Sequence, residues 1–318
     1  EALATSLRAA LTPARQWLRP ENTAAFGMVA WYRGEFDDAR AELEEAAAAR
    51  GDLRSAEIEA VWFMATEPIA SIHTHLALAR FVQGDWAGAR DELAKSERRC
   101  EVLGFPQGPF SLAYIRSHEI FMSCIAGQPK RAAHLVVELA DSAERHGFDF
   151  WAMIAATQQA TVDAMSSLSR EAVDPAELET HIEAMTMFLG LWRSLEINVL
   201  ITYYDGVLAQ LLIAAGRQAE AAEALVTAFA MADDTGMRFY NAELLRIRAR
   251  TVDDDAAHAD LHEAVEVARR QGALIFELSA ASDLFERYGE REALADVVDR
   301  FPPGSTWPQL SRARAQLS

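Results

Sequence analysis

The stretch that decides the fold is GEFDDARAEL, residues 34–43. Its pattern returns as GDWAGARDEL at residues 84–93, and again at residues 127–136 and 216–225. Each copy begins with glycine, has alanine five residues later, and has leucine or valine nine residues later. Four copies of one pattern in a single chain indicate a repeat architecture, in which each copy is one supersecondary unit.

The spacing within each copy predicts two helices joined by a tight turn. Glycine lets the chain leave the first helix in a left-handed turn without steric cost. The alanine and the leucine or valine, four residues apart, then share one face of the second helix. The small residue allows close approach of the two helices. We therefore expect these alanines to be buried where the helices cross: Ala39, Ala89, Ala132 and Ala221.

The upstream halves of the units carry a matching signature. A small residue precedes the turn glycine by seven positions in three copies, as Gly27, Ala77 and Ala209. Together the two halves resemble the tetratricopeptide (TPR) consensus, which implies an all-α, right-handed superhelical solenoid of about six to seven helix pairs. The alternative is a generic alanine-rich helical array. On the TPR interpretation, residues 1–318 form one solenoid, with an N-terminal helix in 1–20, repeats in 21–51, 70–104, 108–147, 150–190, 196–236, 239–272 and 273–300, an inserted helix in 53–65 and a capping helix in 305–318.

The C-terminal stretch carries a narrower resemblance. FYNAELLRIRART (239–251), ADLHEAVEVARRQGALIFELSAASDLFERYGE (259–290) and TWPQL (306–310) are similar to the TPR-like end of bacterial multidomain signalling ATPases, of the adenylate/guanylate cyclase-associated or transcriptional-regulator type. The family has Asp at the position of Gln309, and it has a second Asp at the position of Glu67, which precedes Pro68. The resemblance implies a cytoplasmic sensor or regulatory arm beside an ATPase domain. Because the chain begins at Glu1, we expect a fragment of a longer protein or a processed chain.

Charge and composition exclude several partner classes. With 30 Lys and Arg against 48 Asp and Glu, the net charge is −18. Nucleic acids and anionic membrane surfaces both require a basic face, so we expect neither as a partner. No apolar run reaches the roughly 18 residues of a membrane span. Two cysteines, Cys100 and Cys124, cannot build a disulfide scaffold, which favours a cytoplasmic location.

Motifs for chemistry are missing from the sequence. It has no phosphate-binding loop of the Gly-x4-Gly-Lys-Ser/Thr type. His118-Glu119 begins like a zinc-protease helix, but Met122 takes the position of the second histidine. His73 and His75, two residues apart, point to different sides of a helix. We therefore expect no enzyme activity, no cofactor and no metal site.

The informative surface is the inner face of the first helices of the units. The TPR register places an apolar and aromatic set there, with Cys124 beside it: Met28, Trp31, Tyr32, Thr74, Leu78, Phe81, Tyr114, Ser117, Phe121, Tyr203 and Gln210. Such a groove suits a small molecule or an apolar peptide. It contains no Lys or Arg, which disfavours acidic peptides. The sequence thus predicts a regulatory module that binds a small-molecule effector or a protein partner; the alternatives are a pure protein–protein scaffold and a lining that simply packs as core.

Overall fold

The computed structural model describes residues 6, 9, 11–12, 18–50, 66–170, 172–302 and 304–318. The inserted helix expected in 53–65 and most of the N-terminal helix expected in 1–20 lie outside these residues. Within the described residues all regular elements are helices, as predicted. They are α2(Arg19–Arg33), α3(Phe36–Arg50), α4(Pro68–Val82), α5(Trp86–Glu101), α6(Gln107–Ile125), α7(Pro129–His146), α8(Asp149–Leu168), α9(Pro175–Ser194), α10(Ile201–Ala214), α11(Gln218–Thr235), α12(Asn241–Arg248), α13(Asp254–Gln271), α14(Leu274–Tyr288), α15(Arg291–Arg300) and α16(Pro308–Leu317).

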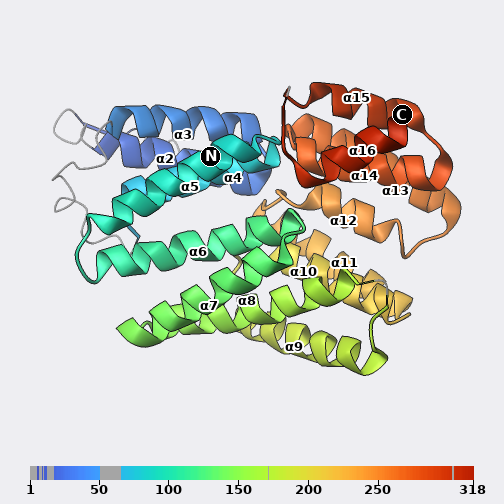
Figure 1. The fold of residues 1–318 in the computed structure, drawn as a ribbon, viewed down its shortest axis with the longest axis horizontal. Coiled ribbons are helices and arrows are strands. Elements are labelled where there is room, and N and C mark those ends of the chain that lie inside the picture. The colour runs from blue at the N-terminus through green and yellow to red at the C-terminus, as the bar shows by residue number, and fades with distance from the viewer. Residues whose placement is uncertain are drawn as a thin grey trace.

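The helices pack in sequential antiparallel pairs (Figure 1). Helix α2 packs on α3, α4 on α5, α6 on α7, and α10 on α11. The even-numbered helices from α2 to α14 also contact one another in succession, so the pairs stack through their first helices. This arrangement is consistent with a helical-repeat domain, while the right-handed superhelix remains a prediction. None of the helices in the described ranges is both long and apolar enough to cross a membrane.

The turn glycines adopt the conformation that their spacing predicted. Gly34 and Gly84 both have φ of 78°, in the left-handed region. At Gly84 a second constraint applies, because an added Cβ would lie 2.7 Å from Cε1 of Phe301. This position therefore needs glycine both for its backbone angle and for a neighbour more than 200 residues away along the sequence.

The small residues lie where the helices cross, which confirms the register. Ala39, Ala89, Ala132 and Ala221 are all 0% exposed. A Cβ on Gly27 of α2 would lie 2.7 Å from Cγ of Leu43 on α3. The close approach of α2 and α3 therefore depends on a residue without a side chain.

The two ends of the helix array meet. Figure 1 shows the C-terminal helices beside the N-terminal ones, and α14 contacts α4. Trp307, just before α16, packs edge-on against Phe81 of α4 with ring centroids 5.3 Å apart. The backbone N–H of Phe239 donates a hydrogen bond to the carbonyl of Tyr32 (3.1 Å). Because the chain curls back in this way, the inner faces of the early helices are covered by later ones.

Candidate functional site

Most of the predicted aromatic lining lies in the core. Trp31, Phe81, Phe121 and Tyr203 are all 0% exposed. Trp31 stacks on Phe239 with ring centroids 4.9 Å apart, and Phe121 packs edge-on against Tyr203 at the same distance. A binding groove requires these side chains to be partly accessible, so this expectation is wrong for the four of them. The physical reason is the curl of the chain, which places residues from the C-terminal half against the inner face.

The remaining predicted residues are divided between core and partial exposure. Thr74 and Leu78 are 0% exposed and Ser117 is 8% exposed. The Thr74 hydroxyl donates to the carbonyl of Ala70 (2.8 Å), which satisfies it within its own helix. Those that keep some accessible surface are Met28, Tyr32, Tyr114 and Gln210. Two of them, Tyr32 and Tyr114, both pack against the ring of His75, with centroid distances of 6.4 and 5.9 Å.

Two histidines that the sequence analysis did not place in the groove lie beside Tyr114. The Tyr114 hydroxyl is 3.3 Å from Nδ1 of His75, and the Tyr114 and His118 ring centroids are 4.4 Å apart. Burial lowers the pKa of His75 to about 3, and the neighbouring His118 contributes to the shift. Burial likewise lowers the pKa of His118 to about 4. Both imidazoles are therefore neutral near pH 7, and their pKa values are too low for efficient general-base catalysis there.

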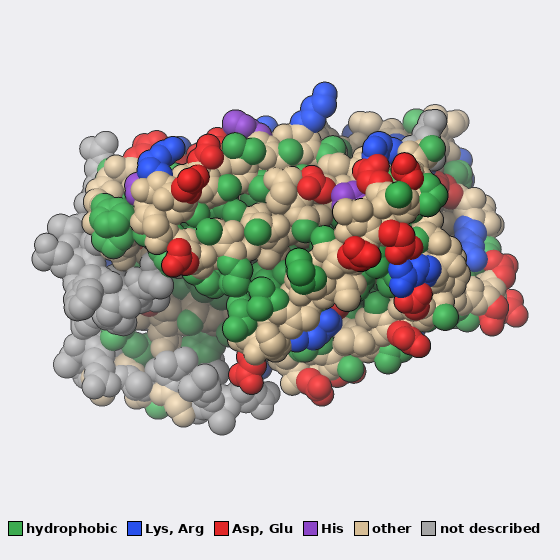
Figure 2. Space-filling view, turned by 90° about the horizontal axis from the view of Figure 1, so that it is seen from below, with side chains coloured by type: hydrophobic (Ala, Val, Ile, Leu, Met, Phe, Trp, Pro, Cys, Tyr) green, Lys and Arg blue, Asp and Glu red, His purple; other side chains and the backbone are tan. Residues whose placement is uncertain are grey.

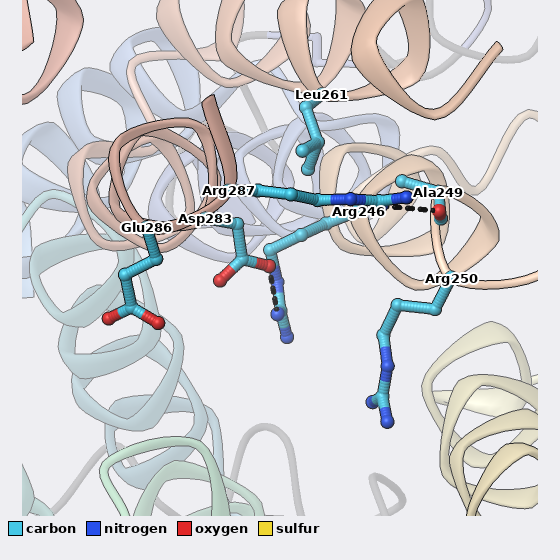
Figure 3. A pocket seen from close by; sticks show the side chains of 7 residues that line it. All are labelled: Arg246, Ala249, Arg250, Leu261, Asp283, Glu286 and Arg287. Atoms are coloured by element: carbon cyan, nitrogen blue, oxygen red, sulfur yellow. Dashed lines mark hydrogen bonds and ion pairs between the residues drawn. The ribbon is translucent and has the colours of Figure 1, made fainter. Parts of the chain in front are cut away.

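The most distinctive open site lies elsewhere, between α12 and α14. It is a pocket of about 290 Å³ lined by Arg246, Ala249, Arg250, Leu261, Asp283, Glu286 and Arg287. Figure 3 shows the side chains of Arg246, on α12, and Arg250, in the turn after it, extending in the same direction, with the carboxylate of Asp283 beside Arg246. Such a pocket combines positive charge with a few carboxylates on an otherwise strongly acidic chain.

Two of the three arginines already have partners. Arg246 donates to both carboxylate oxygens of Glu243 (Nε, 3.1 Å each) and to Asp283 (Nη1, 2.9 Å). Burial lowers the pKa of Arg246, but the charges of Glu243 and Asp283 outweigh it, so the pKa is raised overall. Arg287 donates to the carbonyl of Ala249 (2.9 Å). These contacts fix the walls of the pocket.

Arg250 differs from its neighbours. Among the described residues it has no hydrogen-bond or ion-pair partner, and its side chain is exposed toward the pocket. Its pKa is lowered, first by burial of the guanidinium against the pocket wall and then by the positive charge of Arg246. An arginine in this position stabilises the binding of an anionic group that enters the pocket, because guanidinium groups pair with carboxylates and phosphates in a fixed fork geometry.

The sequence analysis missed this pocket, although a signal existed. Arg246 lies on α12 and Arg250 lies in the turn that follows the helix, four residues later, while Arg248 between them pairs with Asp260 (Nη2 to Oδ1, 2.6 Å). The predicted lining took its residues from four earlier repeats and so contained no arginine. The pocket arginines therefore lie outside the groove that the sequence predicted.

A comparison with protein-family models finds no match, and neither does a comparison with curated proteins. The class that the structure itself defines is an all-α protein of sequential helix pairs, consistent with a helical-repeat domain. Neither comparison shows the narrower resemblance to signalling ATPases.

Proposed function

We propose that this chain is a non-catalytic regulatory module that binds an anionic group, presented by a protein partner or a small effector, in the pocket between α12 and α14. The observation that carries the proposal is Arg250, an unpaired arginine beside the fully paired Arg246 in an open pocket. The volume of about 290 Å³ is at the small end for ligand sites, which suits one acidic side chain or a small carboxylate.

The setting of the pocket supports a regulatory role. Its walls come from two successive first helices, α12 and α14, and from Leu261 of α13. A ligand that pairs with Arg250 while contacting α14 would favour one relative placement of these helices. Such a preference is how a binding module biases a neighbouring domain, here the ATPase domain that the sequence resemblance implies.

The test uses succinate as the probe and succinamide as its uncharged control. Titration calorimetry at low salt should show succinate binding to the wild-type chain, and Arg250→Ala should weaken it about tenfold or more, the scale of one charge-assisted contact. Arg98→Ala is the matched control, because Arg98 is an exposed arginine on the distant helix α5. Equal succinate binding by wild type and Arg250→Ala would overturn the proposal.

A second candidate function is a protein–protein scaffold without a small ligand. On α9, Met187 is 75% exposed and Leu191 is 46% exposed, and Leu195 at the helix end is 51% exposed. These residues are spaced by four and so share one face of the helix. Figure 2, which views the molecule from below, shows apolar side chains distributed among carboxylates on this side. An unpaired apolar stripe of this kind favours a macromolecular contact.

A further inference from the structure

A cluster of metal-ligating side chains lies outside the arginine pocket, at the α14–α15 turn. His258 and His262 are one helical turn apart on α13, and Glu290 is the residue immediately before α15. Nε2 of His262 is 3.2 Å from Nε2 of His258 and 3.1 Å from Oε2 of Glu290. The carboxylate of Glu290 also contacts His258 directly. In the described part of the chain this is the single group of three such residues whose ligand atoms all lie within 4.8 Å.

We propose that His258, His262 and Glu290 form a binding site for a transition-metal dication of the Zn²⁺ type. Two nitrogens bound to one tetrahedral Zn²⁺ at about 2.0–2.1 Å lie about 3.4 Å apart. The observed separation of 3.2 Å between the two imidazole Nε2 atoms is close to that value. The three ligand atoms all lie within 4.8 Å of one another.

The chemistry of the ligand set selects the kind of metal. Two imidazoles and one carboxylate suit Zn²⁺, Co²⁺, Ni²⁺ or Cu²⁺, whereas Mg²⁺ and Ca²⁺ prefer sites made of oxygen alone. Three protein ligands leave a fourth tetrahedral position open to water or to a group from a partner. The site is also reachable from solvent, because the side chains of His258 and His262 are 42% and 48% exposed.

The surroundings hold the ligands in place. The ring of Tyr288 packs edge-on against His258 with centroids 4.6 Å apart. The Tyr288 hydroxyl donates to Oδ1 of Asp254 (3.0 Å), which anchors that ring to the start of α13. Outer contacts of this kind orient metal ligands.

The proposed ion joins parts of the chain that are separated in sequence. Between α13 and Glu290 lies the whole of α14, with Gly289 turning the chain at φ of 74°. A metal bound here ties the start of α15 to the middle of α13. It therefore stabilises the last helix pairs in one arrangement, and this inference does not depend on the arginine pocket.

The experiment uses the whole chain without a polyhistidine tag, stripped of metal by a chelator and then dialysed. Titration with Zn²⁺ should show one saturable site per chain, Mg²⁺ should show none, and Co²⁺ should give the visible absorption of a tetrahedral complex. His262→Ala and Glu290→Gln should each weaken Zn²⁺ binding tenfold or more. Glu290→Gln is informative because Glu290 makes no side-chain capping hydrogen bond, so the start of α15 stays intact.

His134→Ala provides the matched control. His134 is 63% exposed on its side chain and pairs with Glu138 one turn later (3.1 Å), but it belongs to no three-ligand cluster in the described residues. Zn²⁺ affinity in His134→Ala should equal that of wild type. Absence of saturable Zn²⁺ binding by wild type, or unchanged binding by both His262→Ala and Glu290→Gln, would overturn the site.

Discussion

The inner faces of the early and late helices differ in chemistry, although both consist of the first helices of successive pairs. On α2, α4, α6 and α10 the inner face is built of rings such as Trp31, Phe121 and Tyr203, all 0% exposed. At the end of α12 and on α14, Arg246, Arg250 and Asp283 instead line an open pocket. A repeat register therefore predicts which residues face inward, but not whether that face remains accessible to solvent.

What closes the early face is contact with distant parts of the chain. Phe239, which follows α11, stacks on Trp31 of α2. Trp307 lies against Phe81 of α4 with an edge-on geometry that aromatic pairs favour. The late face has no comparable cover on Arg250 among the described residues.

Truncating the centre of the closed face should have the largest effect. Trp31→Ala removes a fully buried ring that contacts Phe36, Phe121 and Phe239. We expect a loss of about 3–5 kcal/mol in the free energy of unfolding, the usual cost of an emptied aromatic site. Urea denaturation measures it, with Val226→Ala, at a residue 68% exposed, as the control. A loss below about 1 kcal/mol would mean that the ring is not core.

Lowering the pH should lower the free energy of unfolding, because His75 and His118 are buried in their neutral form. Their folded-state pKa values of about 3 and about 4 lie below the ordinary 6.5, so the unfolded chain binds more protons between those limits. Stability is therefore complete above about pH 6.5 and falls as the pH falls, by at most about 1.4 kcal/mol per pH unit for each histidine. Burial raises the pKa of Asp205 to about 6, which opposes the loss in the same window.

The measurement is the free energy of unfolding at pH 7, 6 and 5, in wild type and in His118→Gln. Glutamine keeps a donor for the Tyr114 carbonyl, to which Nδ1 of His118 lies at 2.9 Å, but it does not titrate. The variant should therefore show a shallower decline with falling pH. Identical slopes would show that His118 is not held neutral by its surroundings.

A larger side chain at a helix crossing should lower the free energy of unfolding by less than Trp31→Ala does. Ala89 on α5 is 0% exposed, so Ala89→Leu forces α4 and α5 apart and should lower the free energy of unfolding by about 1–3 kcal/mol. Ala87→Leu, on the same helix but exposed, is the matched control and should leave stability within about 0.5 kcal/mol of wild type. Thermal and urea unfolding measure the stability of each variant. If both are equally stable, the register assigned to this repeat fails.

The sequence predicted local features well and long-range ones poorly. Glycine turns and crossing alanines follow from contacts within one unit, and Gly34 and Ala39 appear as expected. The burial of Phe81 depends on Trp307, more than 200 residues later, and no periodicity within a unit encodes that contact. The His258–His262 pair was readable as two metal-type ligands one turn apart, but its partner Glu290 lies one helix further along the chain and was not.

The smallest effect on stability should come from Arg250. Because the guanidinium has no hydrogen-bond or ion-pair partner in the described part of the chain, and lies beside the like charge of Arg246, its removal leaves no partner unpaired there. We expect Arg250→Ala to change the free energy of unfolding by no more than about 0.5 kcal/mol, in either direction.

Arg246→Ala is the contrast. It strips Glu243, 6% exposed, of its partner and should cost about 3–5 kcal/mol, as for other broken buried pairs. A residue that costs nothing to remove yet weakens succinate binding is placed for a ligand rather than for the fold. A loss of several kcal/mol from Arg250→Ala would instead make the open face structural, and the contrast between the two faces would disappear.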